Sequence, residues 1–260
     1  MILNDNRLLY SLLEENVKLY NNADFIKNDP ISIPHLFKNK EDIEISAFLT
    51  ATIAWGNRVS IIKNAIKLIE LMENQPYNFI LNAEESEYLR FDSFVHRTFN
   101  GEDCKFFIHS LKNIYKHHNG LEGVFSKSYS ETIEIFESIS RFRQIFFSLP
   151  HFNRTEKHVS DPAKGSAAKR INMFLRWMVR SDDKGVDFGL WKKIPASALV
   201  CPLDLHTGNI ARKLGLISRK QNDRKAVEEL MIKLRNFDAS DPVKYDFALF
   251  GMGVNNQYIQ

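Results

Sequence analysis

Two residues of this 260-residue chain carry side chains suited to amine chemistry on a sugar carbon. Lys169 opens the segment Lys-Arg-Ile-Asn-Met-Phe-Leu, and Asp204 lies within Leu-Asp-Leu-His, each where a helix is expected to begin. A neutral lysine amine attacks electrophilic carbon, and a nearby carboxylate stabilises the positive charge that develops there. The pair therefore has the residue types of a nucleophile, Lys169, and a charge stabiliser, Asp204, but spacing alone does not assign these roles.

The residues around this pair resemble the helix-hairpin-helix superfamily of DNA glycosylases and apurinic-site lyases. That family opens a helix with a pattern near Lys-Thr-Ala-Asn-Val-Val-Leu, and residues 169–175 keep its lysine, asparagine and leucine in step. Its Val-Asp-Thr-His segment is similar to 203–206, and its early and closing helices are similar to 45–52 and 245–253. The 35-residue spacing from Lys169 to Asp204 is most similar to the archaeal 8-oxoguanine glycosylase branch. The chain also resembles a bacterial family of unassigned function within this superfamily.

The resemblance implies a base-excision repair enzyme that acts on damaged double-stranded DNA, with 8-oxoguanine as the expected base. Lys169 would form an imine with the sugar of a nucleotide flipped out of the stack, and β-elimination would then nick the strand. A free lysine titrates near pH ~10.4, so the attacking amine has to be made neutral by burial or by nearby cations. Arg170 is adjacent to Lys169, and Arg176 and Arg180 follow on the same helix face.

The segment before Lys169 departs from the glycine-rich hairpin of the family. Where the family has Leu-Pro-Gly-Val-Gly, residues 160–168 read Ser-Asp-Pro-Ala-Lys-Gly-Ser-Ala-Ala, with Gly165 as the single glycine. Glycines let backbone amides approach a phosphate, so phosphate binding by this hairpin is open. Lys164 is an alternative nucleophile, and both Lys164 and Gly165 belong to the expected DNA-binding set.

Further expected DNA contacts lie elsewhere in the chain. Trp55 and Asn57 follow an expected helix, where they would present an aromatic ring and an amide to a flipped base. The alternative is a helix–turn–helix corner with Trp55 in the core. Arg97 would contact phosphate or end a helix. His206 completes the set together with Arg170.

Structural explanations and other functions compete with this hypothesis. A helix N-cap alone would explain Asp204. Lys169, Asn172, Arg176 and Arg180 also form the polar stripe that an amphipathic surface helix shows. The rival function is a nucleic-acid-binding protein that kept the fold and lost the chemistry. A third hypothesis is a helical scaffold for protein interactions.

Charge and composition narrow the class of protein. The net charge is only +3, but residues 151–220 hold fourteen Lys and Arg against six Asp and Glu, a net of +8. Such a basic block can contact the phosphates of a nucleic acid or form a solvated face. The two cysteines, Cys104 and Cys201, are too few for a four-cysteine zinc or iron–sulfur site. The histidines lack ligand spacing, so we do not expect a metal site, and the sequence has neither a Walker nor a GxGxxG pattern, so we do not expect a cofactor.

The hydrophobic pattern predicts the elements that hold the two candidate catalytic residues. Apolar residues recur at helical spacing in 45–53, 61–72, 106–115, 133–146, 167–178 and 226–234, and β alternation is absent. Asn119-Gly120 is expected at a helix terminus and Asp241-Pro242 at a helix start. We therefore expect an all-α helical bundle over 1–260, as a single unit or as two lobes with a cleft. Without an apolar run of membrane-spanning length or a signal-peptide pattern at the N-terminus, we expect a cytoplasmic monomer.

Overall fold

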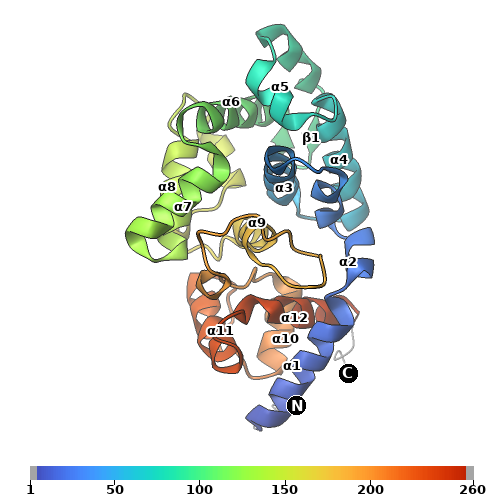
Figure 1. Cartoon of the computed structure of the whole chain (residues 1–260), viewed down its shortest axis with the longest axis vertical. Coiled ribbons are helices and arrows are strands. Elements are labelled where there is room, and N and C mark those ends of the chain that lie inside the picture. The colour runs from blue at the N-terminus through green and yellow to red at the C-terminus, as the bar shows by residue number, and fades with distance from the viewer. Residues whose placement is uncertain (1–4, 256–260) are drawn as a thin grey trace. The chain divides into compact units, whose positions relative to one another are not determined.

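The structure is a computed structural model that describes residues 5–255, and helices make up most of it (Figure 1). Short 3₁₀ segments connect many of the helices. The α-helices of the described residues are α1 (Asn6–Tyr20), α2 (Ala23–Lys27), α3 (Lys40–Ile53), α4 (Arg58–Leu71), α5 (Pro76–Asn82), α6 (Gly101–His117), α7 (Gly120–Thr132), α8 (Ile135–Phe146), α9 (Lys169–Val179), α10 (Leu205–Lys213), α11 (Arg224–Phe237) and α12 (Tyr245–Val254). The prediction of a mainly helical chain is confirmed.

The helix boundaries follow local signals in the sequence. Asn119 adopts a left-handed conformation (φ 59°) between α6 and α7, as the Asn-Gly pair predicted. The helix predicted from residue 133 begins two residues later, at Ile135. Ile133 is instead left-handed (φ 54°) at the end of α7, and the Glu134 side chain caps α8 by accepting hydrogen bonds from backbone N–H groups of its first turn. The predicted helix start at residue 133 was therefore wrong by two residues.

A small antiparallel hairpin is the feature that the hydrophobic pattern missed. Strands β1 (Val95–His96) and β2 (Phe99–Asn100) pair Val95 with Asn100 and His96 with Phe99. Strands of two residues are too short to show the alternation on which the prediction of no strand relied. Arg97 lies in the turn between them with φ 55°.

The chain divides into two compact units. Unit 2 is the continuous segment Ile26–Ser160, and unit 1 combines the chain up to Phe25 with the chain from Asp161 onward. Unit 2 encloses a cluster of phenylalanine rings from α3, α6 and α8, in which Phe107 and Phe146 lie 4.8 Å apart between ring centroids. Phe48 packs edge-on against Phe146 at 5.4 Å. Edge-to-face packing of this kind adds to the stabilisation from apolar burial.

Unit 1 is organised around α12, which packs against both α1 and α10 (Figure 1). All residues of α9 from Ile171 to Val179 are buried, including Asn172 and Arg176. The alternative of a surface helix with a solvated polar stripe is therefore wrong for this segment. Its polar residues find partners inside the protein, which the spacing of polar residues alone does not reveal.

Candidate active site

Lys169 is positioned by a tight turn, residues 161–168, which we call the lysine hairpin. The Asp161 carboxylate accepts a hydrogen bond from the Ala163 N–H at 3.0 Å and starts a single 3₁₀ turn. Gly165 (φ 84°) and Ala168 (φ 47°) then adopt left-handed conformations that turn the chain into α9. Asn172 Nδ2 donates to the carbonyl of Ala167 at 2.9 Å, which fixes the last residues of the hairpin to the helix that Lys169 opens.

Asp204 begins α10 as its N-cap. Its Oδ1 accepts a hydrogen bond from the Thr207 N–H at 3.0 Å, and its carbonyl oxygen accepts one from Asn222 Nδ2 at 2.9 Å. Gly208 makes this arrangement possible, because a Cβ there would lie 2.5 Å from Asn222 Oδ1. The expected capping role of Asp204 is thus present, and it uses only one of the two carboxylate oxygens.

The other carboxylate oxygen faces Lys169. The distance from Lys169 Nζ to Asp204 Oδ2 is 3.8 Å, and the side chains are 26% and 22% exposed. Lys169 Nζ also donates to Met173 Sδ at 3.5 Å, one turn along α9. An amine and a carboxylate that start two helices are thus close together and within reach of a molecule from solvent. This geometry suits attack on an electrophilic carbon with a charge stabiliser beside it.

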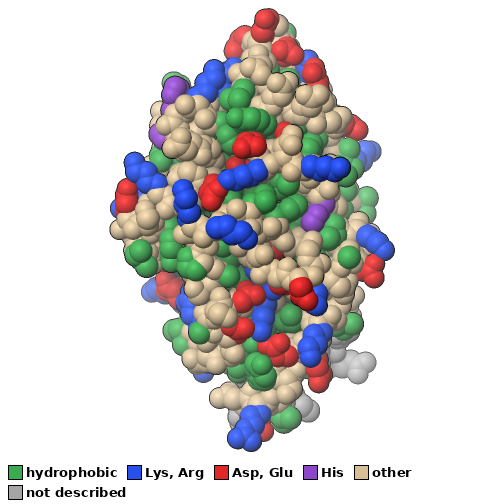
Figure 2. Space-filling model, in the orientation of Figure 1, with side chains coloured by type: hydrophobic (Ala, Val, Ile, Leu, Met, Phe, Trp, Pro, Cys, Tyr) green, Lys and Arg blue, Asp and Glu red, His purple; other side chains and the backbone are tan. Residues whose placement is uncertain are grey.

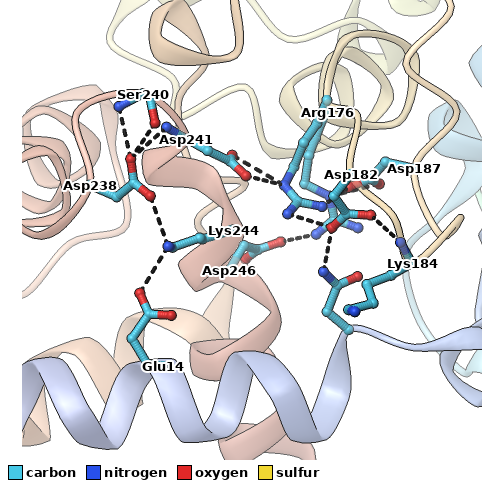
Figure 3. A network of polar contacts seen from close by, with 12 residues as sticks. Glu14, Arg176, Asp182, Lys184, Asp187, Asp238, Ser240, Asp241, Lys244 and Asp246 are labelled. Atoms are coloured by element: carbon cyan, nitrogen blue, oxygen red, sulfur yellow. Dashed lines mark hydrogen bonds and ion pairs between the residues drawn. The ribbon is translucent and has the colours of Figure 1, made fainter.

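Deeper in unit 1, two buried arginines, Arg176 of α9 and Arg180 directly after it, form a network with aspartates (Figure 3). Arg176 contacts Asp246 through Nη1, and its Nε lies 3.3 Å from Asp187 Oδ1. Arg180 binds Asp241 at 3.0 Å and Asp187 at 3.1 Å. The expectation that these arginines act as cations toward Lys169 is not supported, because their guanidinium groups are directed to carboxylates.

The network shifts the proton affinities of its members. Burial raises the pKa of Asp246 and of Asp187, although nearby Arg176 opposes both changes. Burial alone would lower the pKa of Arg180, but Asp187 and Asp241 raise it overall. Buried charges of this kind persist because each has an opposite charge beside it.

Asp246 links this network to the candidate pair. Its Oδ1 lies 3.4 Å from Cys201 Sγ and 3.5 Å from Thr207 Oγ1, both of which can donate a hydrogen. Thr207 is the residue whose backbone N–H caps Asp204. Asp246 lies in segment 245–253, for which no site residue was predicted from the sequence. The feature that could have indicated a role is that Asp246 is the one charged residue of the apolar helix Tyr-Asp-Phe-Ala-Leu-Phe-Gly-Met-Gly-Val.

Trp55 lies in unit 2, in the loop after α3, where it is half-buried. Its ring is edge-on to His96 at 5.1 Å and stacked on His158 at 5.9 Å. His96 Nε2 donates to the Trp55 carbonyl oxygen at 3.2 Å while Nδ1 accepts from Asn64, and burial lowers the pKa of His96. His158 in turn lies 3.2 Å from Asp103. The ring is therefore held by two histidines with part of its surface exposed, an arrangement intermediate between the two alternatives drawn from the sequence.

Two further expected contacts lie next to Trp55. The exposed Arg97 side chain crosses over Gly56, where an added Cβ would come within 2.5 Å of its Nη1. Asn57 is exposed and caps α4, since its Oδ1 accepts a hydrogen bond from the Ser60 N–H at 3.2 Å. Trp55 and Arg97 are thus brought together through Gly56, whereas the Asn57 oxygen already has a local structural role.

The remaining expected contacts belong to unit 1. Lys164 and His206 are exposed, and the His206 ring is edge-on to Phe250 at 6.3 Å. Burial lowers the pKa of Arg170 to about 10, which leaves its guanidinium charged at neutral pH. The Gly165 N–H donates to Pro162 at 2.9 Å, and its carbonyl accepts from Arg224. The amide that a phosphate-binding glycine would offer is therefore engaged within the lysine hairpin.

The basic block 151–220 is less basic at its surface than its composition indicated. Arg176 and Arg180 are buried against carboxylates, and Arg154 binds Asp103 at 3.1 Å. Exposed cations remain in the unit 1 part of the block, at Lys164, Lys184, Lys192, Lys193, Lys213 and Lys220. On the face drawn in Figure 2, basic side chains lie among acidic and hydrophobic ones rather than in one continuous patch.

Within residues 5–255, none of the helices combines the length and the apolar character that crossing a bilayer requires. The same residues contain no group of three or more His, Cys, Asp or Glu side chains arranged to hold a metal ion.

Comparison with known proteins places the chain in a family without assigning its chemistry. No curated protein and no solved structure matches it. A family model described as a protein of unknown function (DUF2400) matches residues 29–255, which is most of the chain. The chain therefore belongs to the DUF2400 family.

Proposed function

We propose that this protein is a DNA base-excision glycosylase with apurinic-site lyase activity, acting on an oxidised purine such as 8-oxoguanine. One observation carries the proposal, namely the 3.8 Å approach of Lys169 Nζ to Asp204 Oδ2 at the starts of α9 and α10. Both side chains keep about a quarter of their surface exposed, so a flipped nucleotide could reach them. The resemblance of the surrounding segments to helix-hairpin-helix glycosylases supports the same chemistry.

The chemical step follows from the types of side chain. The neutral amine of Lys169 forms a bond to C1′ of the sugar while the bond from C1′ to the base breaks, and the base leaves with that electron pair and gains a proton. The carboxylate of Asp204 stabilises the positive charge on the sugar during this exchange. The nitrogen then loses its protons as the bond from C1′ to the ring oxygen breaks, the ring oxygen gains a proton, and the C1′–nitrogen double bond of the imine forms. Removal of a C2′ proton and departure of the 3′ phosphate nick the strand by β-elimination.

The expected contacts to DNA belong to the same proposal. Trp55 offers a partly exposed ring for stacking on a base, and Arg97 offers a charge beside it. Lys164 and His206, both exposed, would contact the phosphate backbone. A monomeric repair protein that uses these residues to bind damaged double-stranded DNA completes the proposal.

The test is covalent trapping of the imine by borohydride. The protein is mixed with duplexes that contain 8-oxoguanine, uracil or an abasic site, and the reduced adduct is resolved from free DNA. The Lys169→Gln variant is expected to bind DNA and to lose the adduct. Lys164→Gln is the matched control, because this exposed lysine lies five residues earlier and was the alternative nucleophile. It is expected to keep the adduct.

Each outcome separates the proposal from its rivals. An adduct that persists in Lys169→Gln and disappears in Lys164→Gln would move the nucleophile to the hairpin. Binding of all duplexes without any adduct would favour a binding protein that lacks the chemistry. Lack of salt-dependent affinity for DNA would refute both and favour a protein-interaction scaffold, because phosphate contacts always release counterions.

A further inference from the structure

Thr207 connects two carboxylates that lie on different helices. Its backbone N–H donates to Asp204 Oδ1 at 3.0 Å, and its hydroxyl lies 3.5 Å from Asp246 Oδ1. The hydroxyl contact is long, so it orients the side chain more than it contributes energy. Thr207 is itself fully buried, which leaves its hydroxyl little freedom to turn elsewhere.

Asp246 is in turn held from its other side. Arg176 contacts Asp246 Oδ2, and the Arg176 guanidinium lies over the Phe247 ring at 4.3 Å. Asp246 thus directs one oxygen to the arginine and the other toward Thr207 and Cys201. A path of contacts therefore runs from the buried arginine, through Asp246 and Thr207, to the carboxylate beside Lys169.

The arginine network at the start of this path holds more carboxylates than arginines. Arg176 and Arg180 bring two positive charges to the network, against four carboxylates from Asp182, Asp187, Asp241 and Asp246. Asp246 is the carboxylate of this network that also interacts with the candidate pair. Asp246 interacts electrostatically with both Asp204 and Lys169, repelling the former and attracting the latter.

We propose that Asp246 is a positioning residue for the Lys169–Asp204 pair, fixing Asp204 through Thr207 and setting the balance of charge around the amine. This inference rests on the proposed function, since the pair has to be catalytic for its positioning to matter. Asp246 has 5% of its surface exposed, so it acts through its neighbours and not on the DNA.

The pH dependence follows from the groups that face Asp246. They are Arg176 and Lys169 on α9, Asp204 and Thr207 at the start of α10, and Cys201 in the segment before it. Removing the negative charge of Asp246 destabilises the protonated forms of its neighbours. The rise of the imine-forming rate with pH should therefore occur at lower pH, by roughly one unit. Loss of orientation should lower the maximum rate roughly ten- to hundredfold.

The experiment measures the rate of borohydride trapping on an abasic duplex at saturating protein between pH 5 and about pH 9, with DNA affinity measured separately. Asp246→Asn is compared with Asp241→Asn, which also removes a carboxylate from the arginine network but which contacts Arg180 instead of Thr207. Thr207→Val and Thr207→Ser form a second pair, because serine keeps the hydroxyl and valine removes it. We expect a pH profile shifted to lower pH in Asp246→Asn and a reduced trapping rate in Thr207→Val. Asp241→Asn and Thr207→Ser should keep a near-normal rate and pH profile. DNA affinity should stay unchanged in the last two variants.

The outcomes separate this inference from the proposed function. Trapping by the unmodified protein with an unshifted profile in Asp246→Asn would overturn the inference and leave the proposed function standing. Equal effects of Asp246→Asn and Asp241→Asn would also overturn it, because that result means a general loss of stability. No trapping by the unmodified protein on any duplex would overturn both.

Discussion

Replacement of Asp204 separates its two roles, the helix cap and the charge stabiliser. Asparagine caps a helix about as well as aspartate, so Asp204→Asn keeps the hydrogen bond from the Thr207 N–H while removing the charge. Alanine removes both. If the carboxylate takes part in the reaction, both variants should lose trapping activity, roughly 10²- to 10⁴-fold.

The stability changes can be worked from the same contacts. Loss of the cap costs about 1 kcal/mol, and the partly exposed pair with Lys169 at 3.8 Å contributes a few tenths more. Asp204→Ala should therefore lose about 1 to 1.5 kcal/mol, which lowers Tm by roughly 3–5 °C in a chain of this size. Asp204→Asn loses the ion pair but also the repulsion with Asp246, so its Tm should change by about 1 °C or less.

The assay combines borohydride trapping at pH 7 with thermal unfolding of the same samples. A rate that falls in both variants while Tm falls only in Asp204→Ala shows that the charge is needed for the reaction. A normal trapping rate in Asp204→Asn would refute the reasoning, because the capping hydrogen bond would then account for everything that Asp204 does.

Three further predictions concern other parts of the structure. Trp55→Ala should weaken binding of a duplex with a flipped or abasic site by about 1–3 kcal/mol, while Trp55→Phe keeps most of the affinity; fluorescence anisotropy measures both, and equal losses would argue against stacking. Gly208→Ala should lower the free energy of unfolding by about 1–3 kcal/mol in urea titrations, since the added Cβ would lie 2.5 Å from Asn222 Oδ1; an unchanged midpoint would mean that the asparagine moves aside at no cost. Burial alone would raise the pKa of Asp238, but hydrogen bonds from Lys244, Ser240 and the backbone of Asp241 lower it overall. The ionised carboxylate therefore stabilises the fold above the unfolded pKa of about 3.9, and this stabilisation is lost as the pH falls through the lowered folded pKa. Asp238→Asn should therefore show a smaller loss of stability between pH 6 and about pH 2 than the unmodified protein, and equal losses in urea unfolding at the two pH values would contradict this.

The sequence predicted the helices and where they begin better than it predicted which residues are buried. Lys169 and Asp204 were placed at helix starts because a hairpin and a capping carboxylate are local signals, and their separation of 3.8 Å agrees with a shared site. The surroundings of Arg176 were misjudged, because its partners Asp187 and Asp246 lie eleven and seventy residues further along the chain. Helical spacing shows which residues share a face but not what that face packs against.

Trp55 shows the same limit in unit 2. Its position after an apolar helix allowed either a core or a surface role, and the structure leaves it half-buried between His96 and His158. Those histidines come from a two-residue strand and a 3₁₀ segment, for which periodicity gives no signal. Asp103, which lies 3.2 Å from His158, looks in the sequence like any acid in the first turn of a helix.

The discontinuity of unit 1 has a consequence for how the protein is made. Unit 2 is one continuous stretch, so all of its residues have been synthesised before α9 begins. Helix α1 emerges first, yet its packing partner α12 is the last helix of the described residues. Because domains generally fold as units during synthesis, the apolar face of α1 has to wait for more than two hundred residues to be translated. Premature termination between Ser160 and the start of α12 would leave unit 2 complete and α1 without this partner, so such fragments would expose apolar surface to chaperones and proteases.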